Sequence, residues 1–342
     1  MGEPAPATTA DPARRAEELT DAALAGDRRA LARLLTAVEN RTPVAEAAMR
    51  RLYPAAGRAH LVGITGPPGS GKSTLVAALI ARVREAGRGV GVIAVDPSSP
   101  ITGGALLGDR VRMQAYAGDR DVFIRSMASR GHAGGLASTS TAAAAVLDAA
   151  GFDLILIETV GTGQSEVEVA AAADTTVVLE APEMGDEVQA IKAGLLEVAD
   201  LVVVNKGDKP GAMRTAAQLR AMLVAGAGPK VGAGEAGTPD RPRPKRPEVL
   251  VTTAATGEGV PELLAALDRH RAAGREGPSS AARLARAEAQ VWAILSDRLG
   301  GALRDPAHAD DTRATLAEVA EHRLDPYAAA DRLLRVLGLG KP

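Results

Sequence analysis

The chain has 342 residues, of which 46% are hydrophobic but only 2% aromatic, with a formal charge of −2. This length exceeds that of a typical single domain, and the near-neutral charge argues against nucleic-acid or membrane-surface partners. Cysteine is absent, which excludes disulfides, zinc–thiolate clusters and a cysteine nucleophile.

The first segment, residues 1–12, is rich in Pro, Ala and Thr and is predicted to be disordered. It has neither the basic start nor the apolar core of a signal peptide, and no run of the chain reaches membrane-spanning length. A cytoplasmic protein is therefore expected. From residue 13 to 56, apolar residues at helical spacing predict a small helical region, as at Leu31, Leu34, Leu35 and Val38.

Residues 57–274 alternate between short apolar runs and helical segments. The runs are almost continuously apolar, as strands buried on both faces are, and they lie at 61–64, 90–95, 152–157, 175–179, 201–204 and 249–252. This pattern predicts an α/β fold with a mainly parallel central sheet. Residues 226–247 are rich in Gly and Pro and predict a solvated loop before the last strand.

Residues 275–342 are charged and helical, with helices expected at 281–299, 311–322 and 326–337. Such an extension either packs against the preceding domain or mediates dimerisation, and the residues alone leave both possibilities open.

A glycine-rich motif links the first strand to the helix at 75–84. It reads Gly66-Pro67-Pro68-Gly69-Ser70-Gly71-Lys72-Ser73-Thr74 and matches the pattern GxxxxGK[ST]. Glycines let backbone N–H groups converge on a phosphate, Lys72 reaches the terminal phosphates, and Ser73 can ligate magnesium. The order strand, loop, helix therefore predicts a P-loop NTPase whose nucleotide contacts are Gly66, Pro68, Gly69, Ser70, Gly71, Lys72, Ser73 and Thr74.

The strand at 201–204 ends in Asn205-Lys206-Gly207-Asp208. A carboxylate at the fourth position can accept the ring N–H and the exocyclic amino group of guanine, a pair of donors that adenine lacks. Asn205, Lys206 and Asp208 are therefore predicted to bind guanine. A backbone N–H among Thr253, Ala254 and Ala255, after the next strand, is expected to support the base. GTP and GDP are the predicted ligands.

Carboxylates follow two other strands. Glu158 ends one of them and is predicted to hold Mg²⁺, directly or through water, or to act on the attacking water. With Ser73, Asp96 and Asp109 it forms the predicted magnesium site, because hard oxygen ligands suit this ion. The Gly161 amide is expected to sense the γ-phosphate.

The predicted catalytic residues are Lys72, Glu158, Asp109 and Lys192. Further candidate cations for the developing phosphoryl charge are Arg110, Arg112, Arg125 and Arg130. Gln164 lies three residues beyond Gly161 rather than next to it, and this spacing argues against a water-positioning role. Because no arginine finger is evident, slow intrinsic hydrolysis that a partner accelerates is expected.

These motifs together resemble the MeaB/ArgK GTPases, the G-protein chaperones of adenosylcobalamin-dependent acyl-CoA mutases, over roughly residues 24–334. The specific marks are Val95-Asp96-Pro97-Ser98-Ser99-Pro100, Leu107-Gly108-Asp109-Arg110, Arg125-Ser126-Met127, Glu158-Thr159-Val160-Gly161 and Gly185-Asp186-Glu187-Val188-Gln189-Ala190-Ile191-Lys192.

The resemblance implies a G domain flanked by N- and C-terminal helical extensions and a homodimer joined through the C-terminal helices. It also implies GTP hydrolysis coupled to loading, protection or exchange of the cobalamin of a partner mutase. Asp96, Asp109 and Glu158 would surround magnesium, and the loop 181–192 would relay nucleotide state to the mutase. The chain departs from the family at Pro182-Glu183-Met184, where a glycine commonly follows the proline.

Three other functions are alternatives to this one. A nickel-insertion GTPase would need a Cys- or His-rich tract, and none is present. An NTP-dependent kinase, as in the older transport-kinase name of the family, would need an acceptor site, and the guanine motif argues against ATP. A nucleotide-binding scaffold without turnover stays open.

Overall fold

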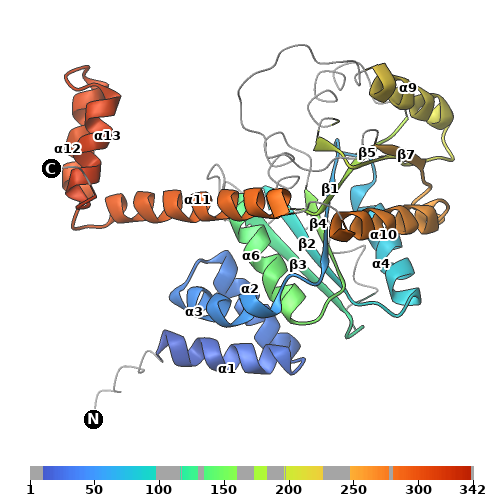
Figure 1. Cartoon of the computed structure of the whole chain (residues 1–342), viewed down its shortest axis with the longest axis horizontal. Helices are drawn as coiled ribbons and strands as arrows, with labels where there is room; N and C mark the ends of the chain where they lie inside the picture. The colour runs from blue at the N-terminus through green and yellow to red at the C-terminus, as the bar shows by residue number, and fades with distance from the viewer. Residues whose placement is uncertain are drawn as a thin grey trace, which may run out of the picture. The chain divides into compact units, whose positions relative to one another are not determined.

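The computed structural model describes residues 11–97, 116, 118–129, 135–159, 173–182, 196, 198–225, 247–276 and 280–339. The chain divides into two compact units, residues 1–286 and 287–342. The first contains a central sheet with helices on both faces (Figure 1).

The sheet has seven strands in the order β3-β2-β4-β1-β5-β6-β7. Every neighbouring pair is parallel. The strands are β1 (His60–Thr65), β2 (Val90–Pro97), β3 (Val122–Ser129), β4 (Leu154–Thr159), β5 (Thr175–Glu180), β6 (Leu201–Val204) and β7 (Glu248–Val251). This arrangement confirms the predicted α/β class with a mainly parallel sheet.

Strand β3 is the one described strand that the sequence analysis did not predict. It lies at the edge of the sheet and pairs with β2 alone, from Val90 opposite Val122 onward. An edge strand has a neighbouring strand along only one of its two hydrogen-bonding edges and is therefore less enclosed than a central strand. Its sequence need not be continuously apolar. Arg125 and Ser126 interrupt the run, and that interruption concealed the strand.

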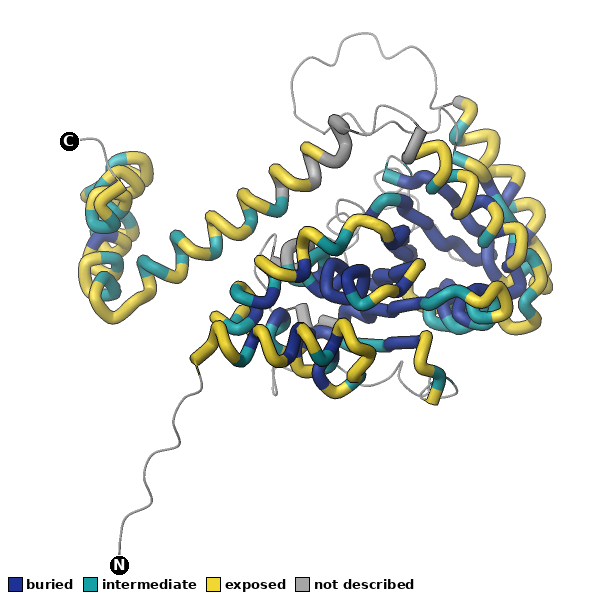
Figure 2. Tube along the Cα trace, turned by 60° about the horizontal axis from the view of Figure 1, so that its bottom comes forward, coloured by how far each residue is buried: buried dark blue, intermediate teal, exposed yellow. Residues whose placement is uncertain are grey.

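Helices cover both faces of the sheet. On one face, α4 (Lys72–Glu85) and α10 (Val260–Glu276) pack against alternate residues of the strands, such as Leu156 and Val177. On the other face lie α6 (Gly135–Ala149) and α9 (Ala212–Ala225), in contact with residues such as Ile157 and Val202. Figure 2 shows the strands buried between these layers. Parallel strands with both faces covered bring their carboxyl ends, and any ligand, to one edge.

The N-terminal region forms α1 (Pro12–Leu24), α2 (Arg28–Glu39), α3 (Pro43–Leu52) and the 3₁₀ turn η1 (Tyr53–Ala55). The N-cap residues Asp11, Asp27 and Thr42 each accept a backbone N–H of the helix that follows, which explains where these helices begin. The helices pack on α6 with a shared apolar core. Arg125 Nη2 of β3 lies 2.5 Å from Glu39 Oε2 of α2, and this ion pair adds a polar link.

A buried carboxylate joins this bundle to the sheet. Asp148 of α6, 3% exposed, accepts the consecutive backbone N–H groups of Gly57, Arg58 and Ala59. These residues lie between η1 and β1. Charge-assisted bonds of this kind fix the direction in which the chain enters β1, the strand that leads to the glycine-rich loop.

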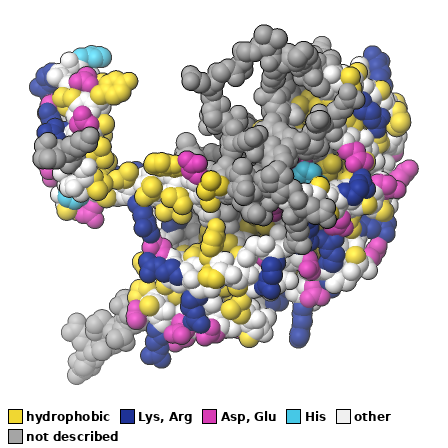
Figure 3. All heavy atoms as spheres, in the orientation of Figure 1, with side chains coloured by type: hydrophobic (Ala, Val, Ile, Leu, Met, Phe, Trp, Pro, Cys, Tyr) yellow, Lys and Arg dark blue, Asp and Glu magenta, His cyan; other side chains and the backbone are white. Residues whose placement is uncertain are grey.

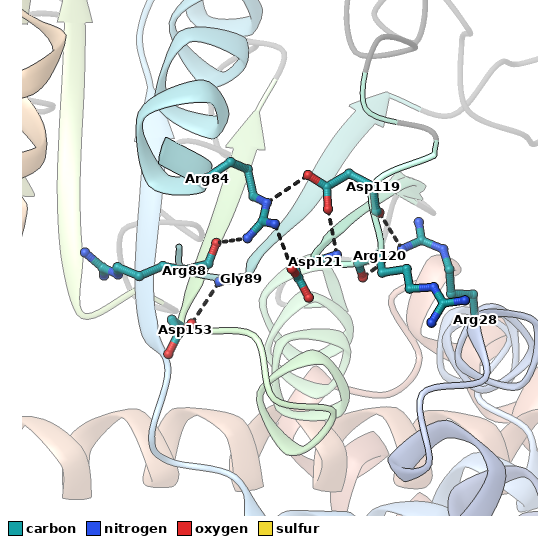
Figure 4. A network of polar contacts seen from close by, with 8 residues as sticks. All are labelled: Arg28, Arg84, Arg88, Gly89, Asp119, Arg120, Asp121 and Asp153. Atoms are coloured by element: carbon teal, nitrogen blue, oxygen red, sulfur yellow. Dashed lines mark hydrogen bonds and ion pairs between the residues drawn. The ribbon is translucent and has the colours of Figure 1, made fainter. Parts of the chain in front are cut away.

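The opposite, amino-terminal edge of the sheet carries an extended polar network (Figure 4). Arg84, at the end of α4, pairs with Asp119 at 2.8 Å and with Asp121 at 2.7 Å. The Arg84 hydrogen bond is the main cause that lowers the pKa of Asp119, and the Asp121 N–H adds to it. Arg28 of α2 donates to the carbonyls of Asp119 and Arg120, so one network connects α4, the turn before β3 and the N-terminal helices.

The second unit contains most of α11 (Ser280–Arg304), then α12 (Ala309–Ala320) and α13 (Pro326–Val336). Arg332 of α13 pairs with Glu318 of α12 at 2.9 Å. Large apolar side chains are exposed along α11, namely Val291, Trp292, Ile294 and Leu295. Figure 3 shows hydrophobic atoms on the visible face of this helix. No helix among the described residues has the length and apolar character that crossing a membrane requires.

Candidate functional site

The glycine-rich loop lies between the end of β1 and the start of α4, as the sequence predicts. Gly66 has φ 142°, and a Cβ at this position would lie 2.2 Å from the carbonyl oxygen of Leu179 on β5. Gly71 has φ 94° at the N-cap of α4, and its Cβ would lie 2.4 Å from Nδ2 of Asn205. Both positions therefore require glycine, for the backbone conformation and for the close approach of a neighbour.

Lys72 is the first residue of α4 and is buried, with its ammonium turned back over the loop. Its Nζ donates to the carbonyl oxygens of Gly66 at 2.8 Å and Pro67 at 3.1 Å. These bonds hold a positive charge against the backbone of the loop. Together with the amino-terminal end of α4, this charge makes the loop a favourable place for an anionic group.

Ser73 and Glu158 come together from α4 and β4. The Ser73 hydroxyl donates to Glu158 Oε1 at 2.6 Å, and the Glu158 residue is only 4% exposed. Hydroxyl and carboxylate oxygens are the hard ligands that Mg²⁺ prefers, and here one of each lie next to each other. These two members of the predicted magnesium set are thus adjacent beside the glycine-rich loop.

Asn205, directly after β6, connects this loop with the predicted guanine motif. Its Nδ2 donates to the Ser70 carbonyl at 2.9 Å, while its Oδ1 accepts the Thr252 hydroxyl at 3.1 Å and the Ala254 N–H at 3.0 Å. Asn205 is 2% exposed. One side chain therefore fixes three segments that are far apart in the sequence, a role that the tetrapeptide alone did not reveal.

The remaining guanine-motif residues lie in tight turns at the same sheet edge. Lys206 has φ 59°, and the Gly207 N–H donates to the Thr252 carbonyl at 2.9 Å. Asp208 is exposed. The loop after β7 is closed by a bond from the Thr253 N–H to the Glu258 carbonyl at 2.9 Å, and Ala255 is exposed. The loop at 205–208 and the loop after β7 therefore lie side by side, and Asp208 is exposed to solvent next to them.

Several predicted residues cannot be placed. Asp109, Gly161 and Lys192 lie outside the described residues, as do Arg110, Arg112, Arg130 and Gln164. Asp96 is the next-to-last residue of β2, at the same sheet edge as Glu158, but its side chain is not among those described. Arg125 is described, and its pairing with Glu39 and Thr36 directs its charge to the N-terminal helices.

A second carboxylate at this edge was not singled out from the sequence. Glu180 ends β5 and is 2% exposed. The signal for it is the one that identified Glu158, an acidic residue at the end of a buried apolar strand. By strand alternation Glu180 shares the face of Val178, which packs toward α9 and away from Ser73.

Comparison with known proteins agrees with these features. Residues 31–307 match the family described as Methylmalonyl Co-A mutase-associated GTPase MeaB. A putative GTPase of Pyrococcus abyssi is 44% identical over 326 residues, covering 95% of this chain and 98% of that protein. The mouse mitochondrial methylmalonic aciduria type A homolog is 34% identical over 281 residues, covering 80% of this chain and 64% of that protein. A crystal structure of an LAO/AO transport system kinase superposes with a TM-score of 0.63 at 26% identity, over 95% of this chain and 98% of that one.

Proposed function

This chain belongs to the MeaB family of methylmalonyl-CoA mutase-associated GTPases, and from that premise we propose a specific activity. It binds GTP and GDP with Mg²⁺, hydrolyses GTP to GDP and phosphate, and assists an adenosylcobalamin-dependent acyl-CoA mutase in cofactor loading, protection or exchange. The observation that carries the nucleotide part is the Asn205 bridge, because it joins a phosphate-binding loop to a guanine motif.

At the phosphate end, Lys72 neutralises the terminal phosphates and the loop amides bind their oxygens. Ser73 and Glu158 hold Mg²⁺, which supplies further neutralisation of charge on the β- and γ-phosphate oxygens. The hydroxyl–carboxylate contact of 2.6 Å supports this assignment, because both donors are hard oxygens. We assign Asp96 and Asp109 to the same ion, Gly161 to the γ-phosphate and Lys192 to the developing charge.

At the base end, Asp208 accepts the two guanine donors while Asn205 and Lys206 shape the pocket. The test is competitive binding of GTP, XTP and ATP to the unmodified protein and to Asp208→Asn. The substitution should weaken GTP binding and strengthen XTP binding, because the amide offers xanthine the donor that it needs. Equal affinity of the unmodified protein for ATP and GTP would overturn the base assignment.

The partner assignment rests on family membership and predicts a measurable coupling. The GTPase rate should be slow alone and should rise at least tenfold with a cobalamin-dependent acyl-CoA mutase from the same organism, because the partner completes the site. Lys72→Ala with the same mutase controls for contaminating phosphatases. If the rate is unaffected and the two proteins do not associate with either GDP or a non-hydrolysable GTP analogue, the chaperone role is excluded.

We also propose a homodimer formed through the C-terminal helices. Trp292 is 61% exposed and Val291 is 54% exposed on α11, and such side chains cost free energy in water unless a partner covers them. Light scattering should give twice the mass of the chain, and Trp292→Glu should reduce it. Tyr53→Glu, at an exposed aromatic residue in the N-terminal region, should leave the mass unchanged.

The name of the related crystal structure favours one second candidate, a kinase. The two functions differ in the fate of the γ-phosphate. GTP labelled at that position should yield inorganic phosphate, whereas a kinase would yield a labelled acceptor.

A further inference from the structure

One side of α11 carries an ordered row of exposed side chains. The row consists of Glu288, Val291, Leu295 and Arg298. Their spacings along the chain are three, four and three residues. At 3.6 residues per turn, positions with these spacings lie on the same side of a helix. We call these four residues the α11 stripe, and in chain order it reads acid, two apolar residues, base.

Two further large apolar side chains flank the α11 stripe. Trp292 is 61% exposed and Ile294 is 41% exposed, and the helical repeat places one on each side of the stripe. The indole N–H of Trp292 donates to Glu288 Oε1 at 3.4 Å, so the ring lies beside the acidic end of the stripe. Stripe and flanks together form an apolar face that costs free energy in water until another surface covers it.

The C-terminal unit that contains most of α11 has little core of its own. Of the described residues from 287 to 339, Thr315 and Ala329 are the two that are buried. Both are small, so no large apolar side chain is fully buried in this described part of the chain. A unit of this size without a hydrophobic core is not expected to be stable alone, and association with another surface would supply the missing burial.

We propose that two copies of this chain pair through the α11 stripe, antiparallel and about a two-fold axis at Ala293. The inference rests on the homodimer proposed above and adds its orientation and register. Reversal about residue 293 places Glu288 opposite Arg298 of the second copy. It also places Val291 opposite Leu295, because the spacings of the stripe read the same in both directions. A two-fold axis repeats each contact, so an acid–base pair lies at both ends of an apolar centre.

The order of the charges favours this orientation over a parallel one. Parallel pairing would place Glu288 against Glu288 and Arg298 against Arg298, and like charges across a helix seam repel each other. Antiparallel pairing replaces both repulsions with attractions, whereas the apolar centre is covered in either orientation. The two charged residues therefore set the direction of the pair, and the apolar residues supply most of its free energy.

The first test is sedimentation equilibrium of the full-length protein and of charge-reversed variants. In a dimer of Glu288→Arg each acid–base contact becomes a contact of two bases, and in Arg298→Glu it becomes a contact of two acids. Each variant alone should therefore self-associate at least about tenfold more weakly than the unmodified protein. An equimolar mixture of the two variants should restore the dimer, because every acid of one chain then faces a base of the other. Arg304→Glu reverses a charge on the side of α11 away from the stripe and should leave association unchanged.

Disulfide cross-linking tests the register itself, and the absence of cysteine from the chain gives it a clean background. In the antiparallel pair, position 288 of one copy faces position 298 of the other. Two copies of position 288 lie about 15 Å apart along the helix axis, well beyond the roughly 7 Å between Cα atoms that a disulfide can bridge. Glu288→Cys and Arg298→Cys should therefore form a linked dimer when they are mixed and oxidised, and neither should do so alone.

The possible failures are distinguishable. If the unmodified protein is monomeric, the proposed homodimer is wrong and this inference falls with it. If the unmodified protein is dimeric but the charge-reversed variants associate equally well, or their mixture stays monomeric, only the α11 pairing is overturned. Linked dimers from Glu288→Cys alone would indicate parallel helices and would also overturn it. Circular dichroism of each variant should show unchanged helix content, which separates weaker pairing from unfolding.

Discussion

Asn205 and Ser70, 135 positions apart in the sequence, are joined by a hydrogen bond of 2.9 Å from the Asn205 Nδ2 to the Ser70 carbonyl. The same asparagine approaches Gly71 so closely that a methyl group there would lie 2.4 Å from Nδ2. The glycine-rich loop is thus held from the side of the guanine motif. Binding at one end of the nucleotide should therefore depend on the other end.

Asn205→Ala should lower both stability and nucleotide affinity. The change leaves the Ser70 carbonyl, the Thr252 hydroxyl and the Ala254 N–H without their partner. Buried groups left in this way cost about 1–3 kcal/mol each, so a loss of about 3 kcal/mol in unfolding free energy is expected. Urea denaturation and calorimetry with Mg·GDP would measure it. Asn40→Ala, at the other asparagine of the chain, should leave GDP affinity intact. Wild-type values for both properties of Asn205→Ala would refute the bridge.

Lys72→Ala should abolish turnover and weaken GDP binding about 100-fold, since the ammonium that Lys72 holds against the loop is lost. The variant also loses the contacts from Nζ to the Gly66 and Pro67 carbonyl oxygens of the loop. Lys209→Ala removes an exposed lysine near the guanine motif and serves as the matched control. Phosphate release and GDP titration would test this. Unchanged hydrolysis in Lys72→Ala would show that the site is elsewhere.

Glu158→Gln should raise the Mg²⁺ concentration needed for half-maximal turnover by about tenfold, because a neutral amide is a weaker ligand for a hard cation. GDP binding measured without Mg²⁺ should change little. Glu180→Gln is the matched control, since it alters another buried carboxyl at a strand end that faces the other side of the sheet. A Mg²⁺ requirement that shifts equally in both variants would contradict the assignment of Glu158.

Stability should fall in acid because of His60. Its pKa is about 3 in the folded protein, against 6.5 for a histidine side chain in water, so the unfolded chain binds the proton first. The stabilisation is therefore complete above pH 6.5 and is lost as the pH falls toward 3. Between pH 7 and pH 4 it amounts to about 3 kcal/mol.

Urea denaturation across this range would measure the loss, and His60→Gln should make the dependence shallower by that amount. His322→Asn replaces an exposed histidine with φ 58°, a conformation that asparagine tolerates, and should leave the slope unchanged. An unaltered slope in His60→Gln would show that His60 is not the group responsible.

Local sequence pattern predicted much of the fold and part of the site. Buried parallel strands are continuously apolar, so six of the seven described strands could be predicted, and the order of strand, glycines and helix predicted that Lys72 and Ser73 lie at the start of a helix, where α4 has them. Edge strand β3 was not predicted, because Arg125 interrupts its apolar run. Glu180 was not predicted as a site residue, because a single acidic residue at a strand end does not by itself indicate a function. The predicted domain boundaries, and the roles given to Asp109, Gly161 and Lys192, stay predictions.

What the sequence alone determined is the chemistry available, namely a phosphate loop, a guanine tetrapeptide and acids at strand ends. Each of these is encoded within a few consecutive residues. Only the tertiary structure shows that Asn205 bonds to the Ser70 carbonyl and that Asp148 accepts backbone N–H groups just before β1. It also shows that Thr175 lies between the imidazoles of His60 and His270. Such contacts follow from strand order and from which helix covers which face. The strand order and the placement of the helices depend on how the whole chain packs, and the local sequence pattern does not predict them.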